Sequence, residues 1–156
     1  MSTDWELLVR VIDYYSKYAR ALDALDVDAL AAMVVDDVKI TRPWADGTRV
    51  GRDDLIAYQR EKSQIQNRLA KHYLTNIEAR RDSSGAVFSR AYYQAATFWP
   101  ERTQMFYGEI HDELRDEGDR LLIVHKQILL QRVLELPAAQ GNTLYQGQDA
   151  MALHQL

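Results

Sequence analysis

Apolar residues near the start of the chain recur at steps of three and four, the spacing that places side chains on one face of a helix. Thr3 stands three residues before Glu6, which is the spacing of a capping box, so we expect the helix to begin there. Asp23 lies four residues after Ala19 and projects from the same apolar face, an unusual place for a carboxylate. The apolar positions of this face are Leu8, Val11, Ile12, Tyr15, Ala19 and Leu22.

Two further helices are predicted before the middle of the chain. Residues 26–37 form a short one, with Asp26 as the N-cap and the pair Asp36-Asp37 at the exit. Residues 51–68 form the third, because a glycine and two aspartates precede its apolar positions. These segments account for all the helical periodicity in the sequence.

A hairpin is predicted between the second and third helices. Residues 38–44 favour a strand, and the pair Asp46-Gly47 is a strong turn signal, because both central residues of such a turn need positive φ. Residues 48–51 would then form a short returning strand.

The second half of the chain is rich in β-branched and aromatic residues and has no helical period, which predicts strands. The connections are short enough for antiparallel neighbours, so a meander is expected. Helices followed by an antiparallel sheet indicate an α+β domain whose helices pack on one face of the sheet. The four predicted strands are residues 70–81, 86–99, 103–116 and 120–136.

Composition limits the organisation of the chain. A length of 156 residues with 47% hydrophobic content fits a single domain, which we place at residues 1–136. Residues 137–156 lose periodicity and form a C-terminal tail. The N-terminus lacks a secretory pattern and no apolar run reaches the roughly 20 residues that span a bilayer. A cytoplasmic protein is therefore expected.

Charge and cysteine content limit the kinds of binding partner and chemistry to be expected. A net charge of −4 argues against attraction to nucleic acid or to anionic membranes, so neither is expected as a partner. The sequence has no cysteine, which removes disulfides and thiolate chemistry. No two histidines have the spacing of a helical zinc pair, and glycine-rich nucleotide loops are absent. We expect neither a metal nor a cofactor.

The order of elements, together with the segments "YSKYARALDALDVDALAAMVVDDVKITRP", "GRDDLIAY" and "GEIHDELRDEGDRLLIVHKQIL", resembles the SnoaL-like branch of the NTF2-like superfamily. The resemblance covers roughly Glu6 to Leu136. It implies a cone in which three N-terminal helices pack on a strongly curved, mainly antiparallel sheet that encloses a pocket. Members include enzymes, carriers and structural subunits, so the fold does not determine the function.

Two motifs resemble the dehydrochlorinase and scytalone dehydratase group within this superfamily. "YS" at residues 15–16 is followed seven residues later by Asp23, and "HYLTN" at residues 72–76 opens a strand. The resemblance implies that His72 is a catalytic base and Asp23 its partner. A neutral imidazole is a suitable base near neutral pH, and a carboxylate on one ring nitrogen aims the other into the pocket.

Aromatic residues are candidates for the pocket wall. They could supply apolar surface and phenolic donors to a substrate. His125 stands among apolar strand residues and is a second pocket candidate, whereas His111 alternates with polar residues and is expected to be exposed. The substrate-binding candidates are Tyr14, Tyr18, Trp44, Tyr58, Tyr92, Trp99 and His125, with Tyr93 as a further aromatic of the same kind.

Each site residue also has a purely structural interpretation. Asp23 can be a solvated residue at a helix end, and His72 a satisfied core histidine. The aromatic residues can be core residues of the strands.

The function expected from these features is that of a cofactor-independent lyase or isomerase, of dehydratase or dehydrohalogenase type, acting on a small hydrophobic cyclic molecule. The alternative is a non-catalytic protein that binds a small molecule, or a subunit similar to the small (beta) subunit of aromatic-ring-hydroxylating dioxygenases, which "HYLTNIEA" and "LLIVHKQILLQ" also resemble. The resemblance further implies a homodimer or a homotrimer.

Overall fold

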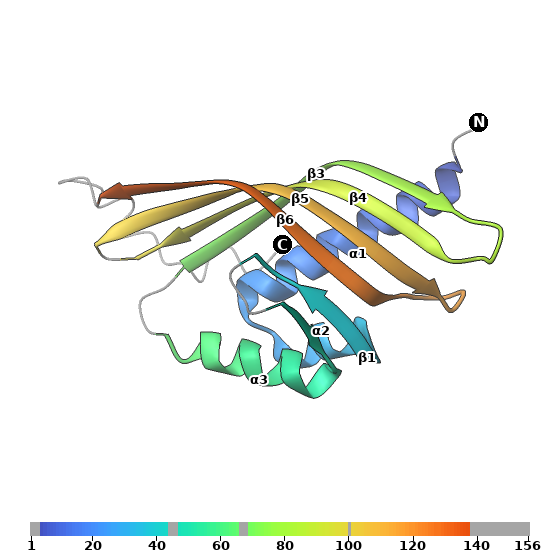
Figure 1. Ribbon diagram of the computed structural model, residues 1–156, viewed down its shortest axis with the longest axis horizontal. Helices are drawn as coiled ribbons and strands as arrows, with labels where there is room; N and C mark the ends of the chain where they lie inside the picture. The colour runs from blue at the N-terminus through green and yellow to red at the C-terminus, as the bar shows by residue number, and fades with distance from the viewer. Residues whose placement is uncertain (1–3, 44–46, 66–68, 100, 138–156) are drawn as a thin grey trace, which may run out of the picture.

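The computed structural model describes residues 4–43, 47–65, 69–99 and 101–137. Within them, helices pack against one side of a curved six-stranded sheet (Figure 1), which confirms the predicted α+β class. The helices are α1 (Trp5–Ala24), α2 (Val27–Ala32) and α3 (Arg52–Ser63). The strands are β1 (Val34–Thr41), β2 (Thr48–Val50), β3 (Leu69–Arg81), β4 (Val87–Phe98), β5 (Arg102–Asp116) and β6 (Leu121–Pro137).

Helix α1 begins close to the predicted position. Asp4 is its N-cap, and the side chain accepts a hydrogen bond from the backbone N–H of Leu7 at 3.0 Å; the expected cap, Thr3, lies outside the described residues. Ile12 was expected on the buried face but is 45% exposed. The buried face is shifted toward Tyr14 and Tyr18, because those positions point at the sheet.

The second predicted helix is too long. Asp26 is its N-cap as expected and accepts from the backbone N–H of Ala29, but the helix ends at Ala32. The pair Asp36-Asp37 lies within β1, not at a helix exit. The β-branched residues around the pair extend instead, because burial against β6 outweighs local helix propensity.

In the N-terminal half, α3 is shorter than predicted and the predicted hairpin is present. Helix α3 ends at Ser63, earlier than predicted, since its polar second half offers little apolar surface to bury. Strand β2 returns antiparallel to β1, which confirms the hairpin, and Gly47 has a φ of +85°.

The predicted meander is present. Strands β3, β4, β5 and β6 pair with their neighbours in order, all antiparallel. Strand β1 joins parallel to β6, so the sheet order is β2-β1-β6-β5-β4-β3. The local sequence pattern gave no sign of this pairing, which brings the end of β1 beside the middle of β6 and closes one side of the cone.

Irregular positions in the strands accompany the curvature of the sheet. The β3–β4 register shifts between Thr75 and Glu78, where Asn76 has a φ of +51°, a left-handed conformation that asparagine tolerates better than most residues. The β5–β6 register shifts beside Gly108. A Cβ atom at Gly108 would collide with the backbone carbonyl of Leu129, so only glycine allows β6 to approach this closely.

A buried ion pair lies beneath α1. Lys126 Nζ is 2.6 Å from Asp112 Oδ2, and both side chains are at most 1% exposed. The hydroxyl of Tyr15 donates to the same carboxylate oxygen at 3.0 Å and is 2.8 Å from Ser89 Oγ. Burial raises the pKa of Asp112 and lowers that of Lys126, while each charge opposes the shift of the other.

We expect Lys126→Met to cost about 3–5 kcal/mol of unfolding free energy, because it leaves a buried carboxylate without its cation. The double variant Lys126→Met with Asp112→Leu should recover most of this loss, since an apolar pair of similar size carries no desolvation cost. Urea denaturation measures both. Lys17→Met, at the exposed pair with Asp13, is the control and should change stability by less than about 1 kcal/mol. A double variant no more stable than the single one contradicts this account.

A second polar contact joins the first half of α1 to the sheet. Both carboxylate oxygens of Asp116 accept from Arg10, at 2.9 and 2.7 Å, and Arg81 donates to Oδ2 at 2.6 Å. These hydrogen bonds lower the pKa of Asp116 well below its usual range. A carboxyl with a lowered folded-state pKa stabilises the fold above its unfolded pKa, and this contribution is lost as the pH falls through the folded value.

Asp116→Asn should therefore lower the Tm at pH 7 relative to the parent protein. The difference should narrow below about pH 4, where the carboxyl of the unfolded parent becomes protonated. Thermal unfolding followed by circular dichroism across this range provides the measurement, with Asp13→Asn at an exposed site as the control. A difference that stays constant down to the acid limit would show that Asp116 does not act through its charge.

Candidate active site

A cavity of about 360 Å³ lies between α1, α3 and the inner face of the sheet. This volume is in the range of small-molecule sites. Small inward-facing residues of β4, Ala95 and Thr97, keep the space open where larger side chains would fill it. The other apolar and aromatic lining residues are Tyr18, Leu22, Leu25, Tyr58, Ile65, Tyr93, Trp99, Phe106, Ile110, Ile128, Leu130 and Val133. The polar ones are Arg42, Gln59, Lys62, His72 and Gln104.

Asp23 and His72 meet at the wall of this cavity. Asp23 Oδ1 lies 2.7 Å from His72 Nδ1 and also accepts the backbone N–H of His72 at 3.0 Å. The two side chains are only 16% and 14% exposed. Lys71 Nζ is 3.6 Å from Asp23 Oδ2, which adds a cation behind the carboxylate. The imidazole therefore has a fixed partner on one nitrogen, as the resemblance implied.

Local structure explains why these residues meet. Helix α1 ends at Ala24, and the next residue, Leu25, takes a left-handed conformation that turns the chain away. Asp23 thus lies in the last turn and faces β3. On β3, His72 pairs with Ala95 of β4, so the imidazole points to the inner face and finds a small neighbour opposite. The ring centroid of Tyr93 is 6.1 Å from that of His72.

The carboxylate determines the tautomer. An ionised Asp23 only accepts hydrogen bonds, so His72 Nδ1 carries the proton and Nε2 presents its lone pair away from Asp23. This is the form of the imidazole that takes up a proton from a bound molecule. Asp23 would also stabilise the imidazolium that results.

The predicted aromatic wall is partly present. Tyr18, Tyr58 and Trp99 line the cavity, as does Tyr93. Burial and the nearby Asp112 raise the pKa of Tyr18, so its hydroxyl stays protonated at neutral pH and remains a donor. The wall thus combines apolar surface with phenolic hydroxyls.

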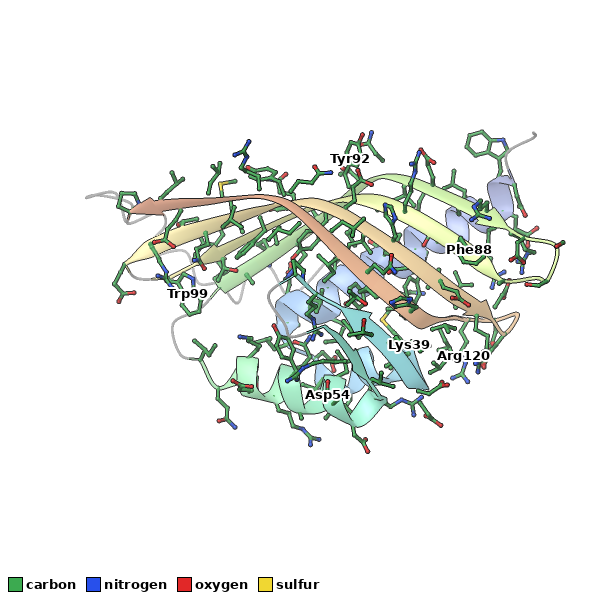
Figure 2. The ribbon with its side chains drawn as sticks, viewed as in Figure 1. Lys39, Asp54, Phe88, Tyr92, Trp99 and Arg120 are labelled. Carbon is green, nitrogen blue, oxygen red and sulfur yellow. The ribbon has the colours of Figure 1, made fainter. Side chains whose placement is uncertain are left out.

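Three predicted substrate-binding residues lie elsewhere, and a fourth, Trp44, is outside the described residues. Tyr14 is a core residue whose hydroxyl donates to the carbonyl of Met33 at 3.1 Å. Tyr92 is 57% exposed on the outer face of β4, because strand residues alternate and its neighbour Tyr93 takes the inner side. Figure 2 shows Tyr92 pointing away from the helices.

His125, the third of these residues, does not line the cavity either. It pairs with Lys39 of β1 and Glu113 of β5, and its Nε2 lies 3.1 Å from Thr41 Oγ1. It borders a separate hollow of about 450 Å³ lined largely by charged residues of the outer face, including His111. The β-bulge before Leu114 places His125 on that side of the sheet. His111, expected to be exposed, is half-buried: its Nε2 lies 2.8 Å from Glu109 and its side chain is 39% exposed.

Two cations line the cavity that were not among the predicted substrate-binding residues. Arg42 and Lys62 both lie against the ring of Tyr58, with Arg42 Cζ 4.1 Å and Lys62 Nζ 5.2 Å from its centroid. A signal for Arg42 existed in the sequence. It continues the alternation of Val38 and Ile40, both buried, so it occupies an inward position of the same strand pattern.

Two further properties concern the described residues alone. In this part of the chain, no three histidine, aspartate or glutamate side chains gather where they could ligate a metal ion. None of the helices there has both the length and the apolarity that crossing a membrane requires.

Comparison with known proteins identifies the family. The SnoaL-like domain family matches residues 5–127, so the chain belongs to the SnoaL-like family. No curated protein matches the chain at a significant level.

Solved structures share the fold. A candidate scytalone dehydratase from Novosphingobium aromaticivorans has a TM-score of 0.72 and 16% identity, covering 89% of this chain and 93% of that one. A type 2 hexachlorocyclohexane dehydrochlorinase has a TM-score of 0.73 and 16% identity, covering 85% and 90%. The beta subunit of benzoate 1,2-dioxygenase from Burkholderia mallei has a TM-score of 0.68 and 18% identity, covering 84% and 93%. At these identities the likeness establishes the fold alone.

The tautomer of His72 can be measured directly. Nitrogen-15 NMR of the neutral imidazole should show the proton on Nδ1 in the parent protein and a mixture of tautomers in Asp23→Ala, because the acceptor is lost. His111, whose Nε2 faces Glu109, supplies an internal control and should keep its proton on Nε2 in both proteins. A proton on Nε2 of His72 in the parent would contradict the assigned hydrogen bond.

Proposed function

We propose that the protein is a cofactor-independent lyase or isomerase in which His72 is the base and Asp23 its orienting partner. The observation that carries the proposal is the 2.7 Å contact between Asp23 and His72 at the wall of an aromatic cavity. A histidine with a purely structural role in the core would be expected to be packed on all sides, whereas His72 borders an open cavity. Perturbed or paired titratable groups in a cleft are the usual mark of a functional site.

The reaction begins with removal of a carbon-bound proton by His72 Nε2. The electron pair of the broken C–H bond moves toward the neighbouring carbon. In a lyase, a hydroxide or halide leaves from that carbon and a double bond forms; in an isomerase, the proton returns to a different carbon. Asp23 compensates the positive charge on the imidazolium, and a protonated phenol such as Tyr18 can donate to a developing negative oxygen.

The cavity favours a small, mainly apolar, cyclic substrate. Its volume of about 360 Å³ and its many aromatic and aliphatic wall residues suit one or two rings. Base catalysis by a positioned imidazole supplies about 10²–10⁴-fold in rate. The remainder of the acceleration must come from orientation and from the electrostatics of the cavity.

Deuterium exchange tests the proposal without knowledge of the substrate. Small cyclic ketones, enones, alcohols and halides are incubated with the protein in deuterated water, and exchange or elimination is followed by NMR and mass spectrometry. His72→Gln should abolish turnover of any active compound, and Asp23→Ala should lower it by about 10²–10⁴-fold. Circular dichroism should show both variants folded.

His111→Gln is the matched control, because it changes the same residue type on the outer face, and it should keep the parent rate. An unchanged rate in His72→Gln would eliminate the proposed mechanism.

A specific observation favours a second candidate function, that of a subunit or binding protein without turnover. The outer face and far edge of the sheet carry exposed apolar side chains, a feature typical of association surfaces. They include Leu69, Tyr73, Tyr92, Phe98, Leu129, Leu134 and Leu136. A homodimer or a homotrimer would cover this surface, as would a larger partner. Binding of the screened compounds without exchange of any of them would favour this second function.

A further inference from the structure

The cavity contains a buried cation, Arg42, that no carboxylate of the described residues neutralises. Arg42 is 7% exposed, and none of its guanidinium nitrogens forms an ion pair or a hydrogen bond with any other residue that the structure describes. Lys126, which is also strongly buried, differs from Arg42, because Asp112 lies 2.6 Å away. A buried charge without a partner is costly, so its retention calls for a compensating interaction.

The surroundings hold Arg42 in place without satisfying its donors. Its guanidinium lies over the ring of Tyr58, 4.1 Å from the centroid, an arrangement that fixes the plane of the group but uses none of its N–H bonds. Its charge acts on neighbouring groups, lowering the pKa values of Tyr18 and Lys126 relative to what burial alone would give. Its donors therefore have no hydrogen-bond partner among the described residues, and Arg42 lines the cavity where a ligand could accept from it.

The charge distribution around the cavity is one-sided. Arg42 and Lys62 line it, whereas none of its described lining residues is an aspartate or a glutamate. The nearest carboxylate to the imidazole, Asp23, lies behind His72 and accepts from it. An anion in the cavity would thus meet two cations on the side of Tyr58 and the imidazole of His72 at the end of α1.

We propose that Arg42 is the anion-binding residue of the cavity and that the natural ligand is a small ring compound bearing an anionic oxygen. A planar guanidinium binds a carboxylate through two parallel hydrogen bonds, and it binds an enolate or phenolate oxygen equally directly. This inference deepens the proposed function and rests on it for the identity of the cavity as the substrate site.

The anionic oxygen can have either of two origins. It can be a permanent carboxylate of the substrate, which Arg42 would use for orientation. It can also form during the reaction, when His72 takes a proton from the carbon next to a carbonyl group: the C–H electron pair forms a C=C bond, and the carbonyl π pair moves to oxygen. In the second case Arg42 stabilises the developing charge.

Binding measurements distinguish these origins. Isothermal titration at constant ionic strength compares cyclohexanecarboxylate with cyclohexanecarboxamide, and dimedone, an enolate at neutral pH, with its methyl enol ether. The anion of at least one pair should bind about 10–100-fold tighter than its neutral partner, the range of a charge-assisted hydrogen bond. Tighter selection of the carboxylate indicates a permanent anion, and tighter selection of dimedone indicates a transient enolate.

Variants connect the selectivity to Arg42. Arg42→Met should remove the preference for the anions while leaving the affinity for the neutral partners within about twofold, and Arg42→Lys should keep part of it. Arg49→Met, at an exposed arginine paired with Asp54, is the matched control and should behave as the parent. Because a buried charge without a partner is costly, Arg42→Met should leave the Tm of the ligand-free protein equal to or higher than that of the parent.

Equal affinity for the anion and its neutral partner in both pairs would overturn the inference on the parent protein alone, whether or not Arg42→Met folds. Unchanged selectivity in a folded Arg42→Met would overturn it as well. His72→Gln separates the two proposals. If the variant binds the anions as the parent does while exchange is absent from every protein, the anion site stands and the catalytic role of His72 fails.

Discussion

The contact of α1 with the inner face of the sheet organises the rest of the molecule. Three polar connections hold it along its length: Arg10 to Asp116 near the start, Tyr15 to the buried Asp112 in the middle, and Asp23 to His72 at the end. Apolar packing alone would tolerate sliding and rotation, whereas directional hydrogen bonds specify one register. The last connection is also the candidate catalytic pair. The same hydrogen bond therefore fixes the end of α1 on the sheet and orients the imidazole of His72.

The inner face of the sheet carries several polar residues. Arg42, His72, Asp112 and Lys126 all occupy positions where alternation would allow an apolar side chain. Asp112 and Lys126 neutralise each other under α1, which makes them part of the support of the fold. Arg42 and His72 instead line the cavity, and Arg42 has no ion-pair or hydrogen-bond partner among the described residues. The buried residues that have a charged partner thus support the fold, whereas those that border the cavity are candidates for binding and chemistry.

Strand alternation decides which side of the sheet the described strand histidines and the pair Tyr92-Tyr93 occupy. His72 faces the cavity, whereas His111 and His125 lie at the outer hollow, and a single bulge in β6 contributes to that division. Tyr92 and Tyr93 are adjacent in sequence but lie on opposite faces. A shift of one residue in the register would exchange these environments completely, which is why the bulges and the glycine at position 108 matter to the site as well as to the curvature.

The sequence by itself determined the order of helices and strands, the meander and the helix cap at Asp26, because periodicity, capping and turn signals act over a few residues. The pairing of His72 with Asp23 was implied by the resemblance to a known group of proteins. The ends of α2 and α3, the parallel pairing of β1 with β6, and the inner or outer position of Tyr92 and His125 were decided by tertiary structure. Burial against distant strands overrides local preference, and pairing register depends on contacts far apart in the chain. The exposure of an uncompensated Arg42 to the cavity belongs to this second group: the alternation hinted at its inward position, but the absence of a neighbouring carboxylate among the described residues is a property of the assembled fold.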